Sequence, residues 1–212
     1  RMVVGFYIGF ENASYVTAMQ ALQVAMTDKV DLCKQYDYEI TSDEWPCIGL
    51  PDALLADRGE LLGHQIEALE HSFSIRIENT APYRGDLKPI VERYFRTAQA
   101  EFKPFASGVV QPFKEKKRGG SDYRLDATLT IHDFKQIIIG SILTYNLTHQ
   151  LKKYDRDIDM PTDLPLVPIH LWNWGIQHRV GRLKQVSEKA LRVALLPKTK
   201  ATLSDLGLKV FG

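Results

Sequence analysis

The fold predicted for this chain is decided by the stretch Gly49-Leu50-Pro51-Asp52-Ala53-Leu54-Leu55-Ala56-Asp57-Arg58-Gly59-Glu60. Its apolar run is continuous rather than alternating, as expected of a strand that is covered on both faces. The run ends at Asp57, which would place a carboxylate at the mouth of a buried strand. The stretch therefore predicts an α/β arrangement in which an acidic group is presented at the end of a central strand.

A second carboxylate, Glu92, lies within residues 87–102, which are predicted to form a helix. Apolar residues at helical spacing form one stripe of it, namely Val91, Tyr94, Phe95, Ala98 and Phe102, and Lys88, Glu92, Arg96 and Gln99 form another. A carboxylate at a strand mouth and one on a helix crossing it can share hard cations that bridge to phosphates. The alternative is that Asp57 opens a polar turn and that the polar stripe is a solvated charge ladder.

Several short motifs accompany these two carboxylates. In chain order they are Arg1-Met2-Val3-Val4-Gly5-Phe6-Tyr7, the helix-like residues 12–26, Trp45-Pro46, Leu55-Ala56-Asp57-Arg58-Gly59-Glu60, residues 82–95, Tyr145-Asn146, Leu171-Trp172-Asn173-Trp174-Gly175 and Leu195-Leu196-Pro197. Together they resemble the catalytic core of the DDE transposases and retroviral integrases. Within that superfamily the resemblance is to the TnsB-type transposases, and it runs from end to end of the chain.

The resemblance implies an α/β fold with an RNase H-like (integrase-like) core, a mixed sheet and flanking helices. That core would span residues 1–154, residues 155–190 would form a linker with a short helical segment, and residues 191–212 would begin a truncated C-terminal β-barrel. The family's first catalytic aspartate belongs to a strand that would precede Arg1, so the chain is expected to be a fragment that is inactive alone. Two positions depart from the family pattern, Pro89 after Lys88 and Arg58 in place of asparagine.

The activity that the resemblance implies is metal-dependent 3′-end cleavage and strand transfer in cut-and-paste DNA transposition. Asp57 and Glu92 would be the catalytic metal ligands, Glu60 an outer-shell carboxylate, and Lys88 and Arg96 contacts to DNA phosphate. The implied cofactor is a pair of Mg²⁺ ions, which Mn²⁺ could replace. Implied partners are transposon-end and target DNA, further copies on DNA, an AAA+ regulator of TnsC type and an endonuclease of TnsA type. Two alternatives stay open: an RNase H-like nuclease that does not join strands, and a non-catalytic DNA-binding or regulator-docking module.

Charge is divided unevenly along the chain, although Lys+Arg total 27 and Asp+Glu 26. Acidic residues dominate up to Glu92 and basic residues after it, which suggests a front that needs cations and a rear that meets phosphates. The basic loop residues Lys114, Lys116, Lys117 and Arg118 are therefore candidate DNA-backbone contacts, with a plain flexible linker as the alternative.

No apolar run approaches the roughly 20 residues that a membrane helix needs, and Cys33 and Cys47 suggest no disulfide framework. A soluble, cytoplasmic and nucleoid-associated protein without membrane contact is expected.

The rest of the chain predicts further elements. Residues 3–10 predict a strand, Asn12 an N-cap for a helix reaching Met26, and residues 28–51 a surface excursion. A helix is expected over residues 64–73, a strand over 75–77, and a helix over 131–151 that begins with a Thr130–Asp133 capping box. Residues 154–168 predict a linker, and residues 201–204 and 208–211 a hairpin.

Overall fold

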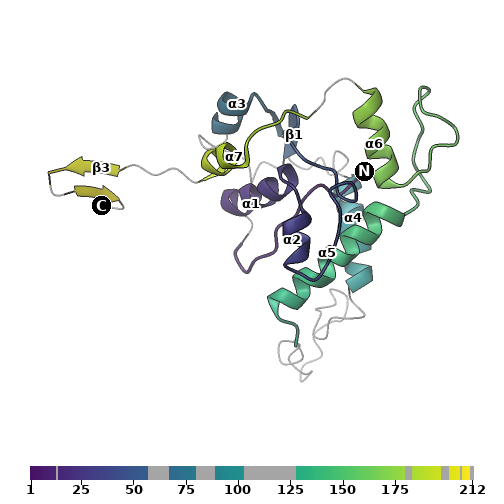
Figure 1. Cartoon of the computed structure of the whole chain (residues 1–212), viewed down its shortest axis with the longest axis horizontal. Coiled ribbons are helices and arrows are strands. Elements are labelled where there is room, and N and C mark those ends of the chain that lie inside the picture. Colours follow the sequence, from purple (N-terminus) through teal and green to yellow (C-terminus); the bar gives the residue numbers. More distant parts are fainter. Residues whose placement is uncertain are drawn as a thin grey trace, which may run out of the picture. The chain divides into compact units, whose positions relative to one another are not determined.

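The computed structural model describes residues 1–12, 14–56, 67–79, 89–102, 128–179, 183–196, 201–205 and 207–210. Helices and strands occur together in these residues, so the described elements are α/β in character (Figure 1). The chain forms two compact units. The first contains Arg1–Val4, Asp28–Cys47 and Tyr83–Arg182, and the second contains Gly5–Thr27, Ile48–Pro82 and Leu183–Gly212.

The second unit contains a parallel pair of strands, β1 (Ala53–Ala56) and β2 (Arg76–Asn79), in the register Ala53 to Arg76 and Ala56 to Asn79. Parallel neighbours require a crossover connection, and α3 (Glu67–Phe73) lies within it. Helix α7 (Glu188–Leu195) packs on α1 (Tyr15–Met26) and on α3. The core of this unit is formed by the buried side chains of Met19, Met26, Leu50, Ala56, Ile75, Leu191 and Leu195.

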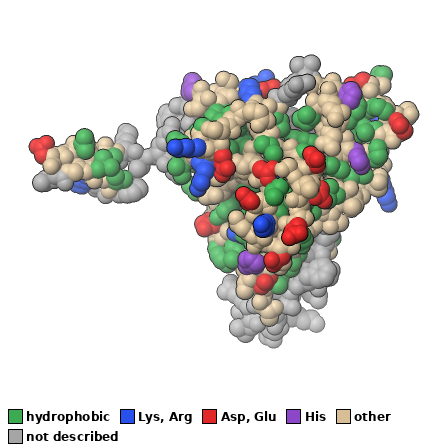
Figure 2. All heavy atoms as spheres, in the orientation of Figure 1, with side chains coloured by type: hydrophobic (Ala, Val, Ile, Leu, Met, Phe, Trp, Pro, Cys, Tyr) green, Lys and Arg blue, Asp and Glu red, His purple; other side chains and the backbone are tan. Residues whose placement is uncertain are grey.

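The predicted C-terminal hairpin is confirmed. Strands β3 (Ala201–Ser204) and β4 (Gly207–Val210) pair antiparallel, and each is exposed along its length. Leu203 and Leu208 are 80% and 67% exposed, and Figure 2 shows hydrophobic side chains on the surface of this hairpin. Within the described part of the chain, these strands form a two-stranded sheet and no closed barrel is present.

The first unit is helical where it is described. It contains α2 (Val30–Lys34), α4 (Pro89–Phe102), α5 (Ile131–Thr148) and α6 (Pro168–His178), and α5 packs against both α4 and α6. The capping box predicted for α5 is confirmed, because Thr130 Oγ1 accepts from the Asp133 amide and Asp133 Oδ2 accepts from the Thr130 amide. Met160, Leu171 and Trp174 form a small hydrophobic cluster after α5.

The strand predicted over residues 3–10 is wrong, because these described residues form no strand. Instead, the backbone amide and carbonyl of Val3 form hydrogen bonds with side chains. The Val3 amide donates to Asn146 Oδ1 at 2.9 Å, and the Val3 carbonyl accepts from Asn146 Nδ2 at 2.9 Å and from Trp45 Nε1 at 2.9 Å. Asn146 is fully buried, and its side-chain amide pairs with the Val3 backbone groups much as the backbone of a neighbouring strand would.

Two further predictions need correction. Helix α1 begins after Ser14 rather than Asn12, since Ser14 and Thr17 form a reciprocal capping box. Residues 28–51 are not a surface excursion, because α2 lies within them and Cys33, Trp45, Cys47 and Leu50 are buried. Aromatic and small apolar residues in this segment pack inward without a regular period, which is why periodicity did not reveal them.

Among the described helices, none is both long and apolar enough to cross a membrane.

Candidate functional site

The strand that should present Asp57 forms at the predicted place, but it is not covered on both faces as predicted, because Leu55 is 52% exposed. Ala56 is buried in the core of the second unit, and β1 ends there. Asp57 follows immediately in the sequence but lies outside the described residues. The buried end of the described strand, Ala56, therefore directly precedes the predicted metal ligand.

Glu92 lies in the first turn of α4, which begins at Pro89. Proline is well suited to this position, because the first helical turn has amides without intrahelical acceptors. The Glu92 side chain is exposed. An exposed carboxylate on a packed helix is a suitable oxygen ligand for a hard cation.

Arg96 lies one turn after Glu92 and is also exposed, so the two side chains share a face of α4. Within the described residues they form no ion pair with each other.

The predicted apolar stripe of α4 is only partly correct. Ala98 is buried and the Tyr94 ring packs edge-on against Tyr145 of α5 at 4.9 Å, but Val91 and Phe95 are 53% and 60% exposed. Helix α4 thus contacts α5 along a narrower line than the spacing suggested.

The other predicted site residues, Glu60, Lys88, Lys114, Lys116, Lys117 and Arg118, lie outside the described residues. Over the parts of the chain that the structure describes, no three His, Cys, Asp or Glu side chains are grouped closely enough to hold a metal ion.

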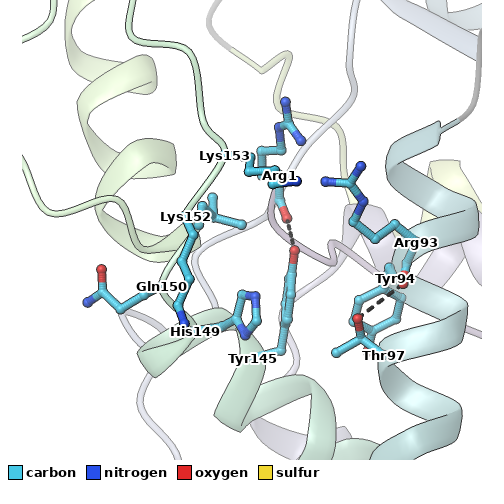
Figure 3. Close-up of a pocket in the computed structure, with 10 residues that line it drawn as sticks. Arg1, Arg93, Tyr94, Thr97, Tyr145, His149, Gln150, Lys152 and Lys153 are labelled. Carbon is cyan, nitrogen blue, oxygen red and sulfur yellow. Dashed lines mark hydrogen bonds between the residues drawn. The ribbon is translucent and has the colours of Figure 1, made fainter.

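A basic pocket that sequence reasoning missed lies in the first unit, beside α4 and the C-terminal end of α5 (Figure 3). Its volume is about 360 Å³, and its lining is Arg1, Arg93, Tyr94, Thr97, Tyr145, His149, Gln150, Leu151, Lys152 and Lys153. Figure 3 shows the Arg93 side chain extending from α4 toward Arg1 and Lys153. The adjacent pair Lys152-Lys153 after a helix was the available sequence signal.

Aromatic side chains that line this basic pocket are held by contacts with their neighbours. The Tyr145 ring stacks on His149 with centroids 4.8 Å apart, and the Tyr145 hydroxyl donates to the Arg1 carbonyl at 3.3 Å. Burial raises the pKa of Tyr145, and the Arg1 charge opposes this in part. The hydroxyl is therefore protonated at neutral pH, as its donor role requires.

Comparison with known proteins places these residues in a family. The model of the TnsB C-terminal domain matches residues 1–108. The chain belongs to the TnsB family. The matched TnsB segment includes both Asp57 and Glu92.

Among TnsB proteins, the transposon Tn7 transposition protein TnsB of Escherichia coli is 56% identical over 212 residues. That alignment covers 100% of this chain and 30% of the Tn7 protein, so the chain spans less than a third of this relative's length. The likeness to TnsB also extends through the second half of the chain, where Lys152 and Lys153 lie.

Proposed function

We propose that this chain carries two metal-ligating carboxylates of a DDE-type DNA transposase, within an RNase H-like core. The observation that supports this most is the position of Glu92, an exposed carboxylate in the first turn of α4 with Arg96 beside it. The Asp57 position immediately after the buried Ala56 of β1, together with membership of the TnsB family, adds to it.

The reaction proposed is polynucleotidyl transfer in two steps. Water first attacks the phosphodiester at the transposon end and frees a 3′-hydroxyl, and that hydroxyl then attacks a phosphodiester of the target strand. Each step forms one P–O bond and breaks another, so it needs no external oxidant or energy source. A pair of Mg²⁺ ions would stabilise the entering and leaving oxygens when bound.

The ligand set fits such ions, because carboxylate oxygens suit Mg²⁺ and Mn²⁺ better than soft metals. Asp57 and Glu92 would hold them, with Glu60 orienting a ligand from outside. Lys88 and Arg96 would neutralise phosphate oxygens next to Glu92, and Arg96 shares the face of α4 on which Glu92 lies. Lys114, Lys116, Lys117 and Arg118 would contact the DNA backbone elsewhere.

The partners proposed follow from the family resemblance alone. They are transposon-end and target DNA, further copies of the protein on that DNA, an AAA+ regulator of TnsC type and an endonuclease of TnsA type.

The test uses the full-length protein with Asp57→Asn, Glu92→Gln and, as a matched control, Glu188→Gln, which alters an exposed glutamate in the first turn of α7. Strand cleavage and joining are measured on labelled transposon-end DNA with Mg²⁺. The two site variants should lose both steps by about a hundredfold to a thousandfold, the range seen when one electrostatic group of an active site is removed, and should keep end binding.

Activity in Glu188→Gln should stay at the wild-type level. Joining by either site variant at the wild-type rate would refute the assignment. Cleavage without joining by the wild-type protein would instead support the non-joining nuclease.

A further inference from the structure

The basic pocket concentrates positive charge. Arg1, Arg93, Lys152 and Lys153 contribute four cationic side chains, and none of the Asp and Glu residues that the structure describes lines the cavity. Among the described residues, no carboxylate pairs with Arg93, Lys152 or Lys153. The C-terminal end of α5 adds only about half a negative charge. The net field in the cavity therefore attracts an anion.

The cations are held by separate parts of the first unit. Arg93 projects from α4, Lys152 and Lys153 follow α5, and Arg1 is fixed through its carbonyl by Tyr145. The Arg1 guanidinium also lies 5.3 Å from the centre of the Tyr154 ring. The aromatic rings of the lining, Tyr94, Tyr145 and His149, are packed on one another, so this part of the pocket is organised before any ligand arrives.

The helical positions connect this pocket to the candidate site. Successive residues of an α-helix are about 100° apart, so Arg96 lies between the direction of Glu92 and that of Arg93. Thr97 follows Arg93 by one turn and lines the pocket, and its hydroxyl donates to the Arg93 carbonyl at 3.1 Å. One polar surface of α4 therefore continues from Glu92 through Arg96 into the pocket.

We propose that the basic pocket holds backbone phosphate of a DNA strand that passes along α4 beside Glu92. The inference rests on the proposed function, which supplies DNA as the substrate. Spaced cations from several segments match a polyanion with regularly spaced phosphates, whereas a single inorganic phosphate would engage only part of them. Arginine and lysine are the usual phosphate contacts in protein–DNA complexes.

The experiment uses the full-length protein and a labelled DNA duplex of unrelated sequence, in EDTA so that no chemistry occurs. The test variants are Lys152→Ala with Lys153→Ala, and separately Arg93→Gln. The control is Lys34→Ala with Lys189→Ala, which removes the same net charge from exposed lysines outside the pocket. The slope of log affinity against log salt should become shallower by about 0.9 for each phosphate that the variant no longer neutralises, and the control slope should stay at the wild-type value.

Ethylation interference on labelled transposon-end DNA, to which the proposed function assigns specific binding, identifies the source of the anion. Ethylated phosphates that weaken binding of the wild-type and control proteins should cease to do so in the pocket variants. Unchanged slopes and interference patterns in folded pocket variants, with folding checked by circular dichroism, would overturn the inference. The inference would also be overturned if the pocket variants bound DNA as the wild-type protein does and lost only the binding of polyglutamate or inorganic phosphate. Should the double variant misfold, Arg93→Gln decides alone.

Failure here is separable from failure of the proposed function. Loss of joining in Asp57→Asn and Glu92→Gln with unchanged salt slopes in the pocket variants would leave the function standing and remove only the pocket. Shallower salt slopes in the pocket variants, with no effect of the carboxylate substitutions on joining, would support the pocket and remove the proposed function.

Discussion

At the scale of single residues, Gly49 fixes the path of the backbone into β1. Its φ of +109° lies in the region that side-chain-bearing residues rarely adopt. Its amide donates to the Met26 carbonyl at 2.9 Å, and the next residue, Leu50, exchanges backbone hydrogen bonds with Lys184. A Cβ at Gly49 would stand 2.9 Å from the Lys184 carbonyl oxygen. The strand that leads to Asp57 therefore depends on the absence of a side chain here.

We expect Gly49→Ala to lower the free energy of unfolding by roughly 1–3 kcal/mol, through backbone strain and the close approach to the carbonyl. Gly175→Ala is the matched control, because this helical glycine has no atom within 4 Å of an added Cβ. Alanine should stabilise that position by about 0.5–1 kcal/mol. Urea unfolding of both variants checks the pair, and equal effects would contradict the account of Gly49.

Lys29 is another residue whose environment has measurable consequences. It is buried and its ammonium donates to the Cys47 carbonyl. Burial lowers the pKa of Lys29 from 10.5 to about 8. Burial raises the pKa of the Cys33 and Cys47 thiols from 9.0 to about 11 and about 12. As the pH rises, the lowered pKa of Lys29 and the raised pKa values of the two thiols therefore change the stability of the fold in opposite directions.

Between pH 8 and 9 the unfolded chain keeps a proton on Lys29 that the folded chain releases, so raising the pH should stabilise the fold. Above pH 9 the unfolded thiols ionise while the folded ones stay protonated, so stability should then fall. Each group contributes at most about 1.4 kcal/mol per pH unit. Urea unfolding of residues 1–212 should show a maximum near pH 9 that is absent, up to pH 10, in Cys33→Ala with Cys47→Ala. A maximum that persists in this variant would contradict the assignment to the thiols.

At the scale of elements, the polar stripe of α4 has two interpretations, a solvated charge ladder and a surface that faces DNA. Glu92 and Arg96 are exposed on one face, and Arg93 and Thr97 line the basic pocket beside it. A solvated charge ladder would contribute only a few tenths of a kcal/mol to the helix. A surface that faces DNA would contribute to the reaction instead.

Arg96→Ala in the full-length protein should reduce strand transfer about tenfold or more, as expected when a charge-assisted hydrogen bond of roughly 1.5–3 kcal/mol to phosphate is removed. The melting temperature should change little, because exposed ion pairs contribute roughly 0–1 kcal/mol. Arg192→Ala, at an exposed arginine in the last turn of α7, is the control. If Arg96→Ala transferred strands at the wild-type rate but melted at a lower temperature, the polar stripe of α4 would have a structural role instead.

Elements with a strong helical period or a cap could be predicted from the sequence, and those determined by distant side chains could not. The apolar spacing of α4 and the Thr130–Asp133 capping box are local signals, and both helices form close to the expected bounds. Residues 3–10 carry an apolar run that favours a strand, but the buried Asn146 amide pairs with the Val3 backbone instead. That pairing joins positions far apart in the chain, so no local pattern contains it.

At the scale of the whole molecule, the candidate site was predictable only in part. Asp57 and Glu92 stay predictions from motifs that are each short but occur together, and the match to the TnsB C-terminal domain over residues 1–108 confirms the family. The basic pocket was not predictable, because Arg1, Arg93 and Lys153 approach one another only after α4 and α5 have packed. Ordinary lysines and arginines acquire a binding role there through tertiary structure.

The most direct test of the central claim, that Asp57 and Glu92 bind the catalytic metal ions, is rescue by a softer metal. Glu92→Cys and Asp57→Cys are made in the full-length protein, and strand transfer is measured with Mg²⁺ and with Mn²⁺. Mg²⁺ binds thiolate poorly and Mn²⁺ accepts it more readily, so each variant should be inactive in Mg²⁺ and recover joining in Mn²⁺, while Glu92→Gln recovers in neither. Equal activity of the cysteine variants in both metals, at the wild-type level, would contradict the account.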